Sequence, residues 1–209
     1  MHQEGQMQVF MHFGQVANFK TNSNIPIDKW PVALNTYLKK SIRIQEAEEV
    51  PESFHSRYNC KEKTYRYVIN NSKYGTAIYR NMEYSFPEKL DIEDMKKAAK
   101  YFEGEHDFKA FKSSGTSAKS SVRTIYKAEV SRANDRIYIE LTGNGFLYNM
   151  VRIIAGTLID VGTGRFDVTA IPDIIAACDR RMAGNTAPPQ GLTHLSTVFT
   201  QSEHAGYNI

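Results

Sequence analysis

The apolar positions along this chain recur at two spacings, and each spacing predicts one kind of secondary structure. Steps of three and four residues, which gather apolar side chains on one face of a helix, occur in four stretches: 28–39, 91–102, 143–165 and 169–182. Runs of alternating, β-branched or aromatic residues predict six strands: 14–21, 42–50, 64–69, 122–131, 136–142 and 192–199. Because helices and strands mix without a regular βαβ repeat, the sequence predicts an α+β fold, with helices over one face of a largely antiparallel sheet.

Turn and cap residues mark the ends of several of these elements. Asp28 and Asp91 stand where the N-cap residues of the first two helices are expected. The residues 133–135 are expected to form the turn of a hairpin. The segment 105–121 is polar, basic and rich in Ser and Gly, so it is predicted to be a long loop, and long loops are often functional.

The strongest apolar pattern belongs to the stretch GNGFLYNMVRIIAGTLIDVGTGR at 143–165. Gly143 and Gly145 predict a tight corner before the helix. An apolar stripe follows at helical spacing: Leu147, Met150, Val151, Ile154, Leu158 and Val161. Arg152 lies on a largely apolar flank of this helix. Its stem could run along the core and carry the charge to the surface, or its guanidinium could be held for a carboxylate or phosphate.

Composition places the chain among ordinary globular proteins. Of its 209 residues, 41% are hydrophobic and 23% are charged, without a bilayer-length apolar run or a signal-peptide pattern. Cys60 and Cys178 stand far apart and give no disulfide framework, so a cytoplasmic location is expected. The six histidines show no ligand spacing with the cysteines, and no metal is predicted.

The basic residues are grouped, although the net charge is only +3. One group surrounds the Ser/Gly-rich loop: Lys109, Lys112, Lys119 and Arg123. The other is interleaved with tyrosines: Arg57, Lys61, Lys63 and Arg66. Cations with stackable rings between them suit a nucleic-acid backbone and its bases, while a solvated charged surface is the alternative that composition alone leaves open.

Five segments, in order, resemble the motifs of one protein family. They are GQVANFKT (14–21), FHSRYNCKEKTYRY (54–67), GEHDFKAF (104–111) with VRTI (122–125), the stretch 143–165, and APPQGLTHLSTVF (187–199). On these motifs the chain is identified as a member of the TruA family of tRNA pseudouridine synthases. The resemblance implies the pseudouridine synthase fold, in which two ferredoxin-like halves share a mostly antiparallel sheet, here with an incomplete N-terminal part. It also implies four regions: a leader 1–13, subdomains 14–90 and 91–200, and a tail 201–209.

The resemblance further implies an activity and a partner. The family isomerises uridine to pseudouridine in the anticodon stem-loop, at about positions 38 to 40 of the tRNA. The reaction oxidises nothing and adds nothing, so no cofactor is expected. The partner is tRNA, no membrane association is expected, and the family is usually homodimeric.

The catalytic carboxylate of the family is missing from its expected place. It belongs to the motif GRTDAGVHA, directly upstream of the segment that begins here at Gly14. Met7 occupies the position of that aspartate and Gly5 that of the arginine before it, while the first twelve residues contain only Glu4 as an acid. A thioether cannot act as nucleophile or base in the way that the family aspartate does, so the sequence predicts that this chain is inactive.

The leader has a simple explanation in the genetic code. MHQEGQMQVFMH can be encoded so that one added G in front gives DASGRTDAGVHA in the next frame, which is the family motif with its lead-in. We therefore interpret residues 1–12 as an out-of-frame translation that joins the family frame near Phe13, with the preceding family strands and helix absent.

Other site residues carry over where the motifs match. Tyr65 corresponds to the tyrosine that stacks on the target base, and Arg152 to the arginine that pairs with the catalytic aspartate. Phe146 and Leu147 resemble residues that shape the uracil pocket, although core packing is an alternative for both. Two other functions remain possible: a catalytically dead remnant that binds RNA, and a basic α+β interaction module without an RNA role.

Overall fold

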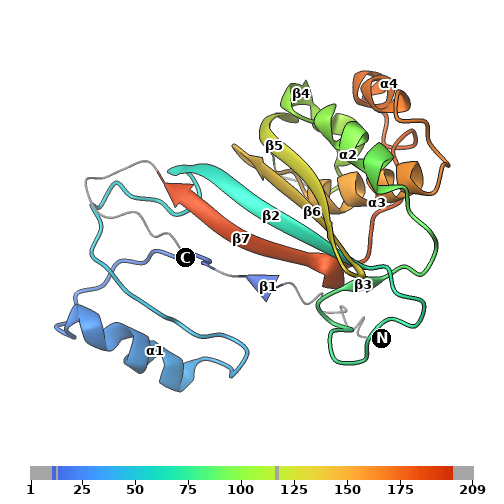
Figure 1. Cartoon of the computed structure of the whole chain (residues 1–209). Helices are drawn as coiled ribbons and strands as arrows, with labels where there is room; N and C mark the ends of the chain where they lie inside the picture. The colour runs from blue at the N-terminus through green and yellow to red at the C-terminus, as the bar shows by residue number, and fades with distance from the viewer. Residues whose placement is uncertain (1–10, 13, 116–117, 200–209) are drawn as a thin grey trace, which may run out of the picture. The chain divides into compact units, whose positions relative to one another are not determined.

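The computed structural model describes residues 11–12, 14–115 and 118–199 (Figure 1). The chain divides into two compact units. The larger contains Met1–Gln15 and Cys60–Val198, and the smaller contains Val16–Asn59 and Phe199–Ile209. Within the larger unit, helices pack against one sheet.

The strands described form a single seven-stranded sheet. Their bounds are β1 (Met11–His12), β2 (Cys60–Asn70), β3 (Tyr84–Ser85), β4 (Gly104–Asp107), β5 (Val122–Ala133), β6 (Arg136–Gly143) and β7 (Leu192–Phe199). The strand order is β1-β7-β2-β6-β5-β4, with β3 paired to β2 outside this path. The long β2–β6 and β5–β6 pairs and the β4–β5 pair are antiparallel, whereas the short β1–β7 and β2–β3 pairs are parallel. The predicted α+β fold with a mostly antiparallel sheet is confirmed.

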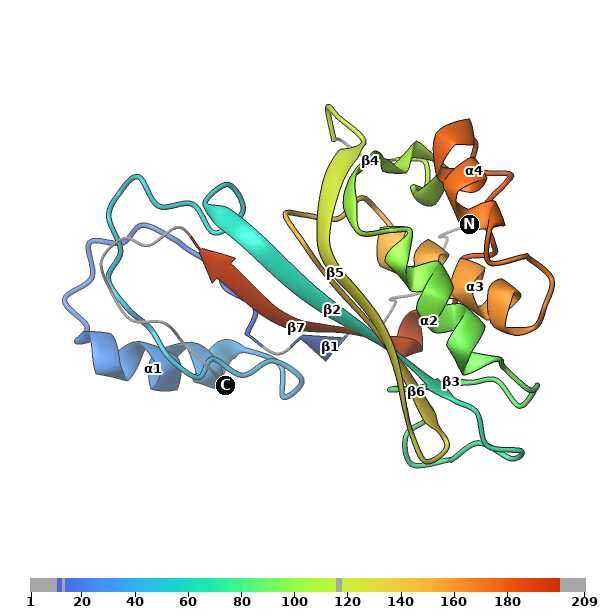
Figure 2. The ribbon, with the colours of Figure 1, turned by 45° about the horizontal axis from the view of Figure 1, so that its top comes forward.

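The two faces of the sheet differ because side chains alternate along each strand. Tyr67 and Ile69 of β2, with Ile137 and Ile139 of β6, are fully buried on one face. That face is covered by α2 (Ile92–Lys100), α3 (Met150–Gly162) and α4 (Ala170–Ala177), as Figures 1 and 2 show. The intervening residues of β2 and β6, which include Arg66, point to the opposite face.

Helix α3 is the central helix of this layer. All of its residues are buried, which agrees with a sequence that is apolar on most sides. It begins at Met150 and not directly after Gly145, because Asn149 has a left-handed backbone with a φ of 62° and ends the preceding turn. The predicted helix at 169–182 likewise ends early, at Ala177, because Cys178 has a φ of 50°.

The segment 105–121 is more ordered than predicted. It contains most of β4 and a 3₁₀ helix, η2 (Phe108–Phe111), whose N-cap Asp107 accepts a hydrogen bond from the backbone of Lys109 at 3.0 Å. Phe108 and Phe111 are fully buried. The prediction of one long loop was wrong here, because these two rings are drawn into the core although their neighbours are polar.

The smaller unit contains the 3₁₀ helix η1 (Ile27–Lys29) and α1 (Trp30–Tyr37). The helix predicted at 28–39 is confirmed, but Asp28 does not cap it, since its N-cap residue is Lys29. The strands predicted at 14–21 and 42–50 were wrong, because the structure has no strand in either range. Their apolar residues are mostly exposed, and neither segment has found a neighbouring strand to pair with.

Candidate active site

Tyr65 lies in a small aromatic group on β2. Its side chain is half-buried. The ring of Phe146, in the turn between β6 and α3, meets it edge-on with centroids 5.2 Å apart, and the ring of His194 from β7 lies 4.9 Å away. Burial raises the pKa of Tyr65, and the negative charge of an ionised Cys60 would add to the rise. The tyrosine is therefore protonated at neutral pH and presents a flat ring beside two others.

Arg152 is held inside the larger unit, with only 7% of its surface exposed. Its Nε donates to the backbone oxygen of Ala187 at 2.7 Å, and its Nη1 donates to Oδ1 of Asn149 at 3.0 Å. Burial lowers the pKa of the guanidinium, and the nearby Tyr67 and Tyr148 act in the opposite direction. Of the two alternatives left by the sequence, this geometry favours a held guanidinium over a surface arginine.

Ala187 and Pro188 connect Arg152 to β2. The backbone N–H of Ala187 donates to the carbonyl oxygen of Arg152 at 3.1 Å, so the two residues exchange hydrogen bonds. The next residue, Pro188, accepts a hydrogen bond of 2.7 Å from the hydroxyl of Tyr67. Tyr67 lies two residues from Tyr65 on the same face of β2, so the arginine and the half-buried tyrosine belong to one packed framework.

The turn after β6 orients Phe146 and Leu147 differently. Phe146 is half-buried and borders the Tyr65 ring. Leu147 is only 5% exposed and belongs to the hydrophobic core. Both pocket roles stay predictions, and of these two residues Phe146 is the one that borders the ring of Tyr65.

Two of the predicted RNA contacts, Lys63 and Arg123, lie close to this turn. Lys63 stands opposite Gly143 in the β2–β6 register. The Nε atom of Arg123 is 3.7 Å from where a Cβ atom on Gly145 would be. These two cations therefore lie at the same end of the sheet as Phe146.

The other predicted RNA contacts are spread over the surface. Lys61 on β2, Lys109 on η2 and Lys119 before β5 are exposed, and Lys112, directly after η2, is half-buried. Arg57 belongs to the smaller unit, where its guanidinium lies 5.9 Å from the ring centre of Tyr58.

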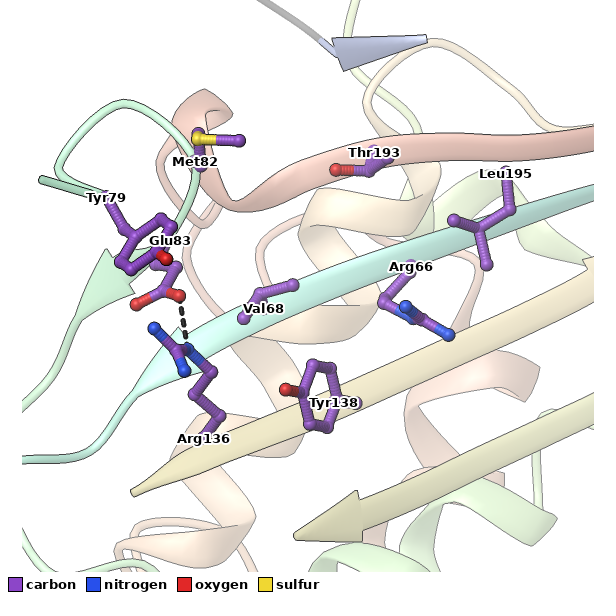
Figure 3. Close-up of a pocket in the computed structure, with 9 residues that line it drawn as sticks. All are labelled: Arg66, Val68, Tyr79, Met82, Glu83, Arg136, Tyr138, Thr193 and Leu195. Carbon is purple, nitrogen blue, oxygen red and sulfur yellow. Dashed lines mark hydrogen bonds and ion pairs between the residues drawn. The ribbon is translucent and has the colours of Figure 1, made fainter. Parts of the chain in front are cut away.

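Arg66 points away from Tyr65, because neighbouring residues of a strand face opposite sides. Its guanidinium is 2.6 Å from a carboxylate oxygen of Glu140 and stacks over the ring of Tyr138 at 5.3 Å. It borders a cavity of about 280 Å³ lined by Arg66, Val68, Tyr79, Met82, Glu83, Arg136, Tyr138, Thr193 and Leu195 (Figure 3). Both arginines of this cavity are paired with glutamates, which leaves it without the excess of positive charge that a phosphate would need.

Sequence reasoning missed His194. It is 3% exposed, and its Nε2 lies 2.9 Å from the hydroxyl of Thr197. The alternation along β7 was the available signal, since Leu192 and His194 share the face that packs inward. His194 stands in the segment 187–199 that resembles the family, but the resemblance gave it no role.

Met7, predicted to replace the family aspartate, lies outside the described residues. Within the part of the chain that the structure describes, no three His, Cys, Asp or Glu side chains gather as they would around a metal ion. No helix in that same part is long and apolar enough to cross a membrane.

The fold and the enclosed tyrosine–arginine framework define an α+β protein with a ring-lined candidate site on one sheet. Comparison with known proteins gives the family. A profile described as "tRNA pseudouridine synthase" matches residues 98–200. The tRNA pseudouridine synthase A of Caldicellulosiruptor saccharolyticus is 51% identical over 89% of this chain and 76% of its own length. That of Ruminiclostridium cellulolyticum is 54% identical over 86% of this chain and 74% of its own length.

A third relative, the tRNA pseudouridine synthase A of Bacillus pumilus, is 45% identical over 89% of this chain and 75% of its own length. Similarity of this extent, carried by several relatives, covers most of the chain. The chain belongs to the TruA family of tRNA pseudouridine synthases, which is a family of isomerases.

Proposed function

We propose that this protein is a cytoplasmic tRNA-binding member of its family whose native reaction is the isomerisation of uridine in the anticodon stem-loop. We further propose that the chain as written does not catalyse that reaction. The observation that carries the proposal is the half-buried ring of Tyr65, flanked by Phe146 and His194 and packed into one framework with the buried Arg152. An aromatic ring of this kind suits stacking on a base that has left its helix.

The chemistry explains why these residues are not enough. In the reaction the bond from C1′ to N1 of uracil breaks and a bond from C1′ to C5 forms, while C5 loses a proton and N1 gains one. A carboxylate must act as nucleophile or base, and a nearby guanidinium favours its ionised form. Arg152 supplies the cation, and Met7 stands where the resemblance expects the carboxylate.

The first prediction concerns turnover. The 209-residue chain should form no detectable pseudouridine in tRNA, because loss of the nucleophile or base removes several kcal/mol of transition-state stabilisation. Replacing residues 1–12 by the in-frame DASGRTDAGVHA, preceded by the family N-terminus, should restore it. The matched control carries alanine for the aspartate that replaces Met7. The measurement is mass-spectrometric mapping of pseudouridine at the anticodon-arm uridines. Turnover by the unmodified chain would refute this proposal.

The second prediction concerns RNA binding without chemistry, which is the alternative function. The cations remain, so weak tRNA binding should be measurable at low salt and should fall steeply with added salt as counterions are released. Tyr65→Ala should weaken binding by about 1–3 kcal/mol if one base stacks on the ring, while Tyr65→Phe, which keeps the ring, should be nearly neutral. Fluorescence anisotropy across a salt series measures both effects. A folded chain that shows no binding, or a flat salt dependence, would leave no RNA function.

A further inference from the structure

Asn149 connects Arg152 to a distant part of the chain. It precedes α3 and has a left-handed backbone, with φ 62° and ψ 6°. Residues other than glycine adopt this conformation at a cost, and asparagine and aspartate tolerate it best. The motifs of the sequence give Asn149 no role.

Both ends of its side-chain amide are engaged. Oδ1 of Asn149 accepts a hydrogen bond of 3.0 Å from Nη1 of Arg152. Nδ2 of Asn149 donates to the hydroxyl oxygen of Ser113 at 3.0 Å. The backbone N–H of Ser113 also donates to the carbonyl oxygen of Tyr148 at 3.1 Å, so Ser113 fixes the turn from two sides. A serine 36 residues earlier in the chain thus orients the group that accepts from the guanidinium.

We infer that Asn149 is a positioning residue, which fixes the plane of the Arg152 guanidinium and couples it to Ser113. The second fixed point of the guanidinium is Nε, bound to the backbone of Ala187. Bonds at Nε and at Nη1 together define the plane and stop rotation about the Nε–Cζ bond. The relevance of a fixed plane to a uracil or a carboxylate rests on the proposed function, whereas the positioning itself does not.

Three substitutions separate the backbone from the amide. Asn149→Gly permits the left-handed backbone but removes both hydrogen bonds. Asn149→Asp tolerates the same backbone and keeps an acceptor for Arg152 while losing the donor to Ser113. Ser113→Ala removes the far hydroxyl and leaves Asn149 intact. A role limited to the turn conformation would make the glycine variant behave like the wild type.

The test is nitrogen NMR of the full-length chain labelled with ¹⁵N, with the Arg152 side-chain signals assigned by their loss in Arg152→Lys. The wild type should give separate, slowly exchanging Nη1 and Nη2 signals. In Asn149→Gly, rotation about the Nε–Cζ bond should accelerate by about tenfold or more, because a hydrogen bond to a charged group is lost. Asn149→Asp should keep the signals separate, and Ser113→Ala should show an intermediate rate.

The outcomes are distinguishable. Separate, slowly exchanging Nη signals in Asn149→Gly would overturn the inference, as would averaged signals in Asn149→Asp when the chain is folded by circular dichroism. Addition of tRNA should shift the Arg152 signals of the wild type. If tRNA shifts nothing and does not bind, the proposed function fails, while the rates in the variants still decide whether Asn149 positions the arginine.

Discussion

Replacing Gly156 by alanine should break the framework that holds Arg152. A Cβ atom at this position of α3 would lie 1.8 Å from the backbone oxygen of Asn185 and 2.9 Å from its carbonyl carbon. These are backbone atoms, so no side chain can swing aside to make room. Acceptable contact needs about 3.2 Å or more, so the opposing segment would have to move by more than about 1 Å.

The size of the effect follows from the bonds that this movement would stretch. They join α3 to the segment opposite: Gly184 N to Thr157 Oγ1 at 3.0 Å, Ala187 N to Arg152 O at 3.1 Å, and Arg152 Nε to Ala187 O at 2.7 Å. Each contributes about 0.5–1.5 kcal/mol net, and the bond from the charged guanidinium contributes more. In a helix interior, alanine stabilises the folded state by only about 0.5–1 kcal/mol relative to glycine. The steric effect is therefore the larger one, and Gly156→Ala should lower the free energy of unfolding by about 2–4 kcal/mol.

Gly162→Ala provides the matched control on the same helix. Its Cβ atom would meet Sδ of Met95 at 2.8 Å and Cδ2 of Leu90 at 2.9 Å, which are the ends of flexible side chains. We expect a cost below that of Gly156→Ala, because both side chains can shift. The assay is thermal and urea unfolding followed by far-UV circular dichroism, since Trp30, the single tryptophan, belongs to the smaller unit.

Gly156→Ala should lower Tm by roughly 5–15 °C. If Gly156→Ala proved as stable as Gly162→Ala, the close approach of α3 to the opposing segment would not matter. The idea that Arg152 is anchored by its bonds to the segment at Ala187 would then have to be abandoned.

Two further predictions concern buried polar groups of the same layer. Burial raises the pKa of Asp160, and this effect outweighs the opposite effect of Arg165. Because the folded state then binds the proton more tightly than the unfolded state, the free energy of unfolding falls as the pH rises from the ordinary carboxyl pKa through the raised pKa of Asp160. Asp160→Asn has no such loss, so its free energy of unfolding in urea should rise relative to the wild type as the pH increases above the ordinary carboxyl value; an unchanged difference would refute this. Tyr67→Phe should cost about 1–3 kcal/mol, because it leaves the oxygen of Pro188 without its 2.7 Å donor. The same change at Tyr126, which is 51% exposed, should cost almost nothing; equal costs would contradict the role of the bond.

The elements predicted correctly are those whose periodicity is set locally. The strands predicted at 64–69 and 192–199 rested on alternation and β-branching. The first lies within β2, and the other has the same bounds as β7. Helix α2 was found together with its cap, since the side chain of Asp91 accepts from the backbone of Asp94 at 3.0 Å. In these segments the residues that decide the structure are neighbours in the sequence.

The errors share a different cause. A strand exists only where another strand pairs with it, and composition at 14–21 or 42–50 does not reveal whether a partner is available. In the opposite direction, Phe108 and Phe111 looked like isolated rings in a basic loop, and their burial against the helices is a tertiary effect. Local pattern carries no information on such long-range contacts.

The residues of the candidate site show the same difference between local patterns, which the sequence reveals, and long-range contacts, which it does not. Tyr65 and Arg152 were found because their motifs stand out in the sequence. Two of their neighbours were missed, since His194 comes from another strand and the acceptor at Ala187 is a backbone oxygen 35 residues from Arg152. A backbone acceptor has no signature in the residue type, so no inspection of the sequence could have named it.

This dependence on backbone acceptors explains how the arginine can be buried at all. Moving a guanidinium out of water is costly unless its donors find acceptors, and the lowered pKa of Arg152 records that cost. The carbonyl of Ala187 and the amide of Asn149 are neutral, so each accepts a hydrogen bond without itself adding a negative charge. A cation held in this way still attracts an anion. The framework of α3, the turn before it and the segment at Ala187 therefore holds the guanidinium in one orientation, and we predict that this orientation depends on Asn149 and Gly156.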